Sequence, residues 1–174
     1  MNPRFIDPND ILKQLNLKEG MTAADFGCGS GGWVIPLAKQ LEGGKVYAID
    51  ILEEPLSALK AKASLEKITN IQSIVADVEK GVDIWEESCD LVLMSNLLFQ
   101  CEDKKKVLQE GKRVLRPGGR VLIVDWQKDN PLTPEIEWVD FSQIKKIAKD
   151  LNLKLEKEFE AGIYHYGLVL VKPR

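Results

Sequence analysis

Short apolar runs alternate with longer amphipathic stretches along most of this chain, and this alternation limits the possible folds more than any other feature. The pattern is typical of a mostly parallel sheet with helices on both faces, so we expect an α/β protein. Apolar runs predict strands at 22–26, 45–51, 71–76, 91–95, 120–125, 153–159 and 164–171. Amphipathic stretches predict helices at 10–17, 33–41, 55–67, 103–115 and 141–151.

Turn-forming residues mark the ends of these elements. Asn9 or Asp10 is placed to cap the first helix, and Pro55 suits the first turn of the third. The sequence Pro117-Gly118-Gly119 is expected to separate the helix at 103–115 from the strand after it. Only residues 160–163 lie between the last two strands. A crossover helix does not fit there, so we predict an antiparallel C-terminal hairpin.

Composition indicates an ordinary globular protein. The 174 residues are 44% hydrophobic and 29% charged, which suits one domain, 1–174, with residues 1–20 as an N-terminal helical segment that caps the site. A net charge of −3 argues against nucleic acid as a partner. Three widely spaced cysteines and one histidine form no disulfide framework and no metal site. No secretion signal or apolar run of about 20 residues is visible, so we expect a cytoplasmic monomer or homodimer without membrane insertion.

A glycine-rich turn follows the first predicted strand. Gly27, Gly29 and Gly32 match G-x-G-x-x-G, and glycine allows both a sharp turn and the close approach of a ligand. The backbone N–H groups that open the next helix are a second feature of a ligand site. The match is also compatible with a tight turn that binds nothing, and with a dinucleotide site.

Two acidic residues narrow these alternatives. Asp50 ends the second predicted strand, where a carboxylate can accept hydrogen bonds from both ribose hydroxyls of either NAD or S-adenosylmethionine. Asp25 lies two residues before Gly27, where its charge would repel a pyrophosphate and attract a sulfonium or an ammonium group. A carboxylate that only stabilises the turn is the alternative for Asp25.

A third acidic residue, Asp77, follows the third predicted strand. Its carboxylate is placed to accept from an adenine amino group, and the Val78 N–H to meet a ring nitrogen. The carboxyl ends of parallel strands meet at one edge of a sheet, so all three acids are expected at the same edge. Asp77 can instead cap a following helix.

These segments together resemble the class I S-adenosylmethionine-dependent methyltransferases over nearly the whole chain. The resemblance rests on residues 25–31, Asp50, 76–78, 90–96 and 115–120, in the order that this family has them. It implies a Rossmann-like, seven-stranded, mostly parallel sheet and S-adenosylmethionine as cofactor, with S-adenosylhomocysteine as product. Within the family, the chain is most similar to the small methyltransferases allied to ubiquinone and menaquinone biosynthesis. The implied cofactor contacts are Asp25, Gly27, Cys28, Gly29, Gly31, Asp50, Ile51, Asp77, Val78 and Asn96.

Candidate acceptor-site residues come from several segments. Asn96 follows the fourth strand and is expected to contact the methionine part or the acceptor, unless it only bonds to the next helix. Phe5, Gln100 and Trp126 are candidate substrate residues, and an aromatic at the core's edge is the alternative for Trp126. No residue is assigned as catalytic. Asn96 and His165 are candidates, although a packed histidine in a central strand is the simpler interpretation of His165.

Other residues point away from particular chemistries. The segment 95–100 has no Pro-Pro-Tyr/Phe sequence, which argues against methylation of nucleobases or glutamine amides. A reactive thiol at Cys28, or a metalloid-binding one at Cys101, has little support.

We therefore expect methyl transfer to a small molecule by in-line displacement. A methyltransferase acting on a protein or RNA component with a partner, a non-catalytic cofactor-binding subunit and an NAD-dependent dehydrogenase are the alternatives.

Overall fold

A single seven-stranded sheet organises the protein. The computed structural model describes residues 6–126, 139–162 and 164–174. In chain order the strands are β1 (Thr22–Phe26), β2 (Lys45–Asp50), β3 (Ile71–Val75), β4 (Cys89–Ser95), β5 (Leu115–Trp126), β6 (Lys154–Glu160) and β7 (His165–Val171). They lie in the order β3-β2-β1-β4-β5-β7-β6. The first five are parallel, and β7 is antiparallel to both of its neighbours. The predicted fold class and C-terminal hairpin are confirmed.

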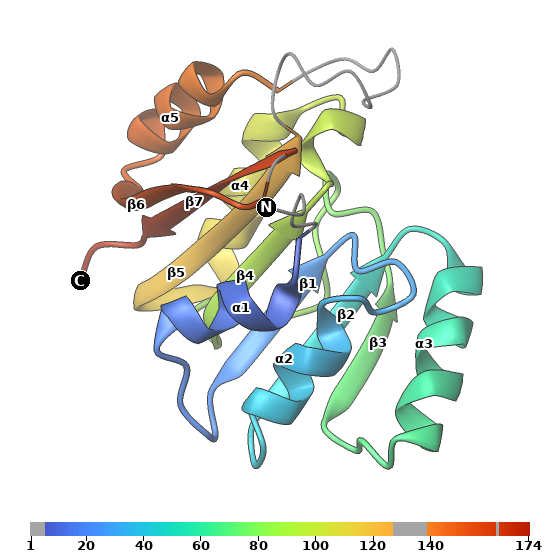
Figure 1. Cartoon of the computed structure of the whole chain (residues 1–174). Coiled ribbons are helices and arrows are strands. Elements are labelled where there is room, and N and C mark those ends of the chain that lie inside the picture. The colour runs from blue at the N-terminus through green and yellow to red at the C-terminus, as the bar shows by residue number, and fades with distance from the viewer. Residues whose placement is uncertain (1–5, 127–138, 163) are drawn as a thin grey trace.

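Helices cover both faces of this sheet (Figure 1). The helices are α1 (Pro8–Leu12), α2 (Val34–Gln40), α3 (Glu53–Leu65), α4 (Lys104–Val114) and α5 (Phe141–Asp150), with the 3₁₀ turns η1 (Lys13–Leu15) and η2 (Leu98–Gln100). One buried cluster joins α1, α2 and α3 to the sheet, and the other joins α4 and α5 to its opposite face. Consecutive core residues of β5 alternate between these clusters, as a two-sided buried strand requires.

The first helix begins earlier than expected. Asp7, and not Asn9 or Asp10, is its N-cap, because the Asp7 carboxylate accepts from the Asn9 N–H at 2.9 Å and Pro8 occupies the first helical turn. The α-helix ends at Leu12, and η1 carries the chain on to Asn16, which has a left-handed φ of 49°. Ile11 and Leu12 are buried, so this segment packs into the core.

Strand β5 also begins earlier than expected, at Leu115 directly after α4. Leu115 pairs with Cys89, and the register shifts before Leu91 pairs with Arg120. The Pro117-Gly118-Gly119 sequence therefore lies inside the strand as an irregularity and does not separate it from the helix. The Gly118 N–H donates to Lys172 O at 2.8 Å, which attaches this irregular stretch to the end of β7.

The strand that carries His165, β7, is not central in the sheet. This differs from the sequence-based expectation of a central strand. β7 is second from the edge, and β6 is the edge strand. The β6 side chains are mostly exposed and charged, as is common for edge strands that avoid pairing with other chains.

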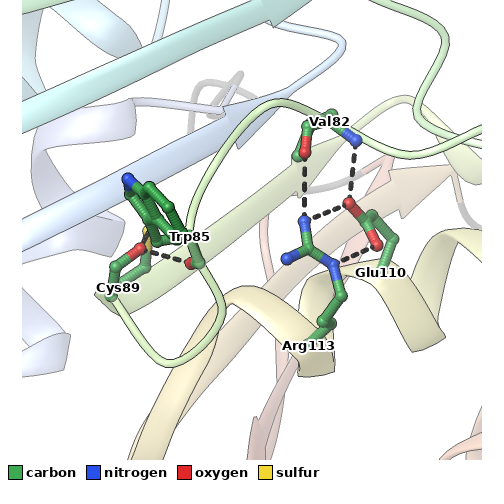
Figure 2. A network of polar contacts seen from close by, with 6 residues as sticks. Val82, Trp85, Cys89, Glu110 and Arg113 are labelled. Atoms are coloured by element: carbon green, nitrogen blue, oxygen red, sulfur yellow. Dashed lines mark hydrogen bonds and ion pairs between the residues drawn. The ribbon is translucent and has the colours of Figure 1, made fainter.

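The connection between β3 and β4 is fixed to α4 by a charged pair (Figure 2). Arg113 donates to Glu110 at 2.7 and 2.8 Å, Glu110 accepts from the Val82 N–H at 2.8 Å, and Arg113 donates to the Val82 carbonyl at 3.0 Å. Because Val82 makes both backbone contacts, this network fixes the connection that contains Asp77.

Candidate functional site

Polar residues gather at the carboxyl ends of the five parallel strands. Asp25 lies near the end of β1, Asp50 ends β2, Asp77 follows β3, Asn96 follows β4, and Asp125 is the last residue but one of β5. In open α/β sheets this edge is where ligands bind. The expectation that Asp25, Asp50 and Asp77 share one edge is confirmed by the parallel pairing of β1, β2 and β3.

The glycine-rich turn has the backbone conformation that sequence predicted. Gly27, Gly29 and Gly31 have φ values of 71°, 53° and 88°, a region that residues with a Cβ rarely adopt. A Cβ on Gly27 would lie 2.7 Å from Leu97 Cδ1, and a Cβ on Gly31 would collide with Leu59. Around Gly29 and Gly32 there is open space instead. The turn is thus packed on two sides and leaves room for a ligand at Gly29.

Asp50 connects this turn to the end of β2. Its Oδ2 accepts from the Gly29 N–H at 2.9 Å, and its Oδ1 accepts from the Leu52 N–H at 3.0 Å. Both bonds orient the carboxylate at the sheet edge, where the side chain is half-buried. A carboxylate oxygen can accept more than one hydrogen bond, so Asp50 keeps the capacity to accept ribose hydroxyls.

Asp25 is the least compensated charge at this edge. The residue is 1% exposed, and neither carboxylate oxygen has a hydrogen-bond partner among the described residues. Burial, with the nearby charge of Asp50 as a second cause, raises the pKa of Asp25 well above its usual range. A buried, unpaired carboxylate is costly, so this site favours a ligand that brings positive charge and N–H donors.

The residues expected around the adenine differ in exposure and in their contacts. Val78 is buried, whereas Ile51 after β2 is 62% exposed and available to a planar ring. The Asp77 carboxylate accepts from the Glu79 N–H at 3.0 Å and pairs with Lys80 at 2.9 Å, and these contacts lower its pKa. Because the Lys80 side chain is 82% exposed, this ion pair adds little stability and can exchange for a ligand.

Asn96 and Gln100 lie on one turn after β4. Asn96 has a left-handed φ of 50°, and its N–H donates to the Val124 carbonyl at 2.8 Å. The buried Asn96 Oδ1 has no hydrogen-bond partner among the described residues. The Gln100 amide donates to the Asn96 carbonyl at 2.6 Å, so the two candidates are directly connected. An unpaired amide oxygen at this edge favours contact with a donor group of a ligand.

Trp126 and His165 meet where β5 ends and β7 begins. Their ring centroids lie 4.0 Å apart, and the two residues are paired across the strands. Burial lowers the pKa of His165 to about 4, so its imidazole is neutral at physiological pH and a weak base there. The pair therefore suits an aromatic wall better than it suits proton transfer. The third aromatic candidate, Phe5, lies outside the described residues.

The cysteines show no sign of reactivity. Burial, then the charges of Asp25 and Asp50, raise the pKa of Cys28, and burial raises the pKa of Cys101 to about 12. Both thiols are protonated near neutral pH and are therefore poor nucleophiles. Among the residues that the structure describes, no group of three or more His, Cys, Asp or Glu side chains is arranged to hold a metal ion.

Asp125 was not singled out by sequence reasoning. It is 1% exposed at the end of β5, and burial raises its pKa to about 6. Its position in the sequence could have identified it. Asp125 lies at the carboxyl end of a predicted strand, which is the feature that identified Asp25, Asp50 and Asp77.

Comparisons with known proteins agree with this geometry. A family model described as a methyltransferase domain matches residues 17–162. The chain is 29% identical over 152 residues to a demethylmenaquinone methyltransferase of Shouchella clausii, covering 87% of this chain and 63% of that protein. A demethylmenaquinone methyltransferase of Staphylococcus aureus is 30% identical over 153 residues, covering 86% of this chain and 62% of its own. The chain thus spans less than two thirds of the length of these relatives.

Solved structures give the same result. The crystal structure of a SAM-dependent methyltransferase from Aquifex aeolicus superposes with a TM-score of 0.88 at 28% identity, covering 96% of this chain and 90% of that one. No helix among the described residues has the length and apolarity needed to cross a bilayer. The domain match, the relatives and the shared sheet lead to one assignment: the chain belongs to the class I S-adenosylmethionine-dependent methyltransferases and is close to the menaquinone type.

Proposed function

We propose that this protein transfers the methyl group of S-adenosylmethionine to a small-molecule acceptor by in-line displacement. The observation that carries the proposal is Asp25, a buried carboxylate whose oxygens have no partner among the described residues. A cationic methionine moiety would supply the missing positive charge and donors. The pyrophosphate of a dinucleotide would add negative charge beside Asp25 and Asp50, which argues against NAD.

Each site residue has a defined task in this proposal. Asp25 attracts the cationic part of the cofactor, and Asp50 accepts hydrogen bonds from its ribose. The open space at Gly29 leaves room for the cofactor beside the turn. Ile51 and Val78 pack against the adenine, and Asp77 accepts from its amino group. When bound, S-adenosylmethionine supplies a methyl group on a positively charged sulfur, so the protein contributes mainly position and electrostatics.

An aromatic acceptor fits the opposite half of the site best. Trp126 lies against His165 at the end of β5, with ring centroids 4.0 Å apart and ring planes tilted by 36°. Aromatic side chains favour planar ligands. The relatives named demethylmenaquinone methyltransferases support the same class, and we propose a quinone-like aromatic as the first acceptor to try.

The cofactor is tested by thermal shift with S-adenosylmethionine, S-adenosylhomocysteine, NAD and NADP. A ligand at about 100 times its Kd stabilises the folded state by roughly 2.7 kcal/mol, or about 5–11 °C in Tm for a domain of this size. We expect this shift with the two adenosyl-sulfur compounds alone. A shift with NAD or NADP instead would refute the proposal.

Turnover is tested with a short-chain demethylmenaquinone, in oxidised and chemically reduced form, and mass spectrometry of the product. A mass gain of one methyl group is the expected result. Binding of S-adenosylmethionine without methylation of either form would redirect the search to a protein or RNA acceptor, or to a non-catalytic subunit.

A further inference from the structure

The first turn of α4 concentrates positive charge. The helix begins with Lys104, Lys105 and Lys106, and the N–H groups of a first turn add the positive end of the helix dipole. Asp103 caps this helix, because its Oδ1 accepts from the Lys106 N–H at 3.1 Å. In a capping box, Glu or Gln at the Lys106 position would accept from the N–H of the cap residue in return. Lysine has no acceptor, so the Asp103 N–H needs one from another segment.

Glu79 supplies this acceptor from the connection between β3 and β4. Its Oε1 accepts from the Asp103 N–H at 2.5 Å, and its Oε2 accepts from the Glu102 N–H at 3.3 Å. The side chain is half-buried, and both of its oxygens are used. An ionised carboxylate suits this place, because it accepts at both oxygens and offsets the positive charge of the turn. An amide would present N–H groups at one of the two positions.

Glu79 also belongs to the segment that is expected to contact the adenine. Its N–H donates to Asp77 Oδ1 at 3.0 Å, and Val78 lies between these two residues in the chain. Glu79 is therefore bonded through its backbone to Asp77 and through its side chain to the start of α4, which lies 24 positions later in the sequence.

The start of α4 follows directly on the turn that carries the candidate acceptor contacts Asn96 and Gln100. This turn is bonded within itself. The Gln100 and Cys101 N–H groups donate to carbonyls of the turn at 2.9 and 3.3 Å, and the Gln100 side chain donates to the Asn96 carbonyl at 2.6 Å. The Asn96 end is attached to β5, and the other end runs into the two N–H groups that Glu79 accepts from. Glu79 is thus the attachment at the Gln100 end.

We propose that Glu79 is a positioning residue, which fixes Gln100 on the acceptor side of the site relative to Asp77 on the adenine side. The role toward the acceptor rests on the proposed function. The effect on the turn does not, since it can be measured in the free protein without any acceptor.

The experiment is amide-resolved hydrogen exchange by NMR in wild type, Glu79→Gln and a control variant. In Glu79→Gln we expect exchange of the Asp103 amide to rise about fivefold at neutral pH, because this N–H loses a charged acceptor. The Gln100 and Cys101 amides keep their own acceptors, so a local loss of the cap would leave them unchanged. We expect them to rise by a similar factor, because the turn loses its attachment.

The control Glu86→Gln removes the same charge from the same connection. Glu86 is exposed and lies near Arg113, in the last turn of α4, so this variant should exchange like wild type. An increase confined to Asp103 would overturn the proposal, because Glu79 would then only cap α4. Unchanged exchange in Glu79→Gln, or equal increases in both variants, would overturn it as well.

Two constants separate the acceptor from the cofactor. With any acceptor that wild type methylates, Glu79→Gln should raise the KM of the acceptor about fivefold and leave the Kd of S-adenosylmethionine within about twofold, because the backbone bond to Asp77 remains. An unchanged KM would contradict the role toward the acceptor. If wild type methylates nothing, the proposed function fails, and the exchange result still decides whether Glu79 holds the turn.

Discussion

Two buried acids at the sheet edge, Asp25 and Asp125, differ in what surrounds them. Asp125 has an N–H donor at 2.9 Å, whereas Asp25 has no hydrogen-bond partner among the described residues. Where a carboxylate has no protein partners, an amide can replace it with little loss of stability. Such a carboxylate is, however, well placed to bind a cation. The two residues are therefore expected to respond differently to the same substitution.

For Asp25→Asn we predict weaker cofactor binding in a more stable protein. Loss of a charged hydrogen-bond acceptor costs about 1.5–3 kcal/mol, which corresponds to a roughly 10- to 150-fold higher Kd for S-adenosylmethionine. Removal of an unpaired buried charge should raise the Tm of the free protein at neutral pH. Titration calorimetry and thermal unfolding measure the two effects. The exposed Asp83→Asn is the control, and wild-type affinity in Asp25→Asn would contradict the role of this residue.

At the scale of elements, the turn between β1 and α2 is determined by glycine conformation and by packing against α3. Gly31 and Gly32 are adjacent, yet only Gly31 has a positive φ and a neighbour that a Cβ would strike. We predict that Gly31→Ala lowers the free energy of unfolding by about 2–4 kcal/mol, from backbone strain and overpacking against Leu59. Gly32→Ala, with open space around it, should change it by less than about 0.5 kcal/mol. Denaturant unfolding distinguishes the two, and equal losses would show that the turn is not limited by packing.

Sequence predicted most elements because their signals are local. The glycines, the acids at strand ends and the four-residue connection of the hairpin are all readable within a few residues. The start of β5 at Leu115 was missed because it depends on pairing with Cys89, 26 positions away in the sequence. The burial of Asp125 was missed for the same reason, since Asp125 pairs with Tyr166 of β7, 41 positions away in the sequence.

At the scale of the whole molecule, two neighbouring groups should change the stability in opposite directions as pH changes. Asp125 and His165 lie on the paired strands β5 and β7, one residue out of register. Burial raises the pKa of Asp125 from 3.8 to about 6 and lowers the pKa of His165 from 6.5 to about 4. Asp125 binds its proton more tightly in the folded state, so its contribution is present at about pH 4 and is lost as pH rises to about 6. His165 stays neutral in the folded state, so its contribution is present above about pH 6.5 and is lost as pH falls to about 4.

Each of these two pKa shifts changes the free energy of unfolding by about 3 kcal/mol across this pH range. The two changes therefore largely cancel between about pH 4 and pH 6.5 in wild type. Single substitutions should reveal them separately. Relative to wild type, Asp125→Asn should become more stable as pH rises through this window, and His165→Gln should become less stable. Urea unfolding of the three proteins at several pH values gives the two differences. If both differences have the same sign, then burial does not set these two pKa values in opposite directions, and the end of β5 is more accessible to water than the packing of Asp125 and His165 indicates.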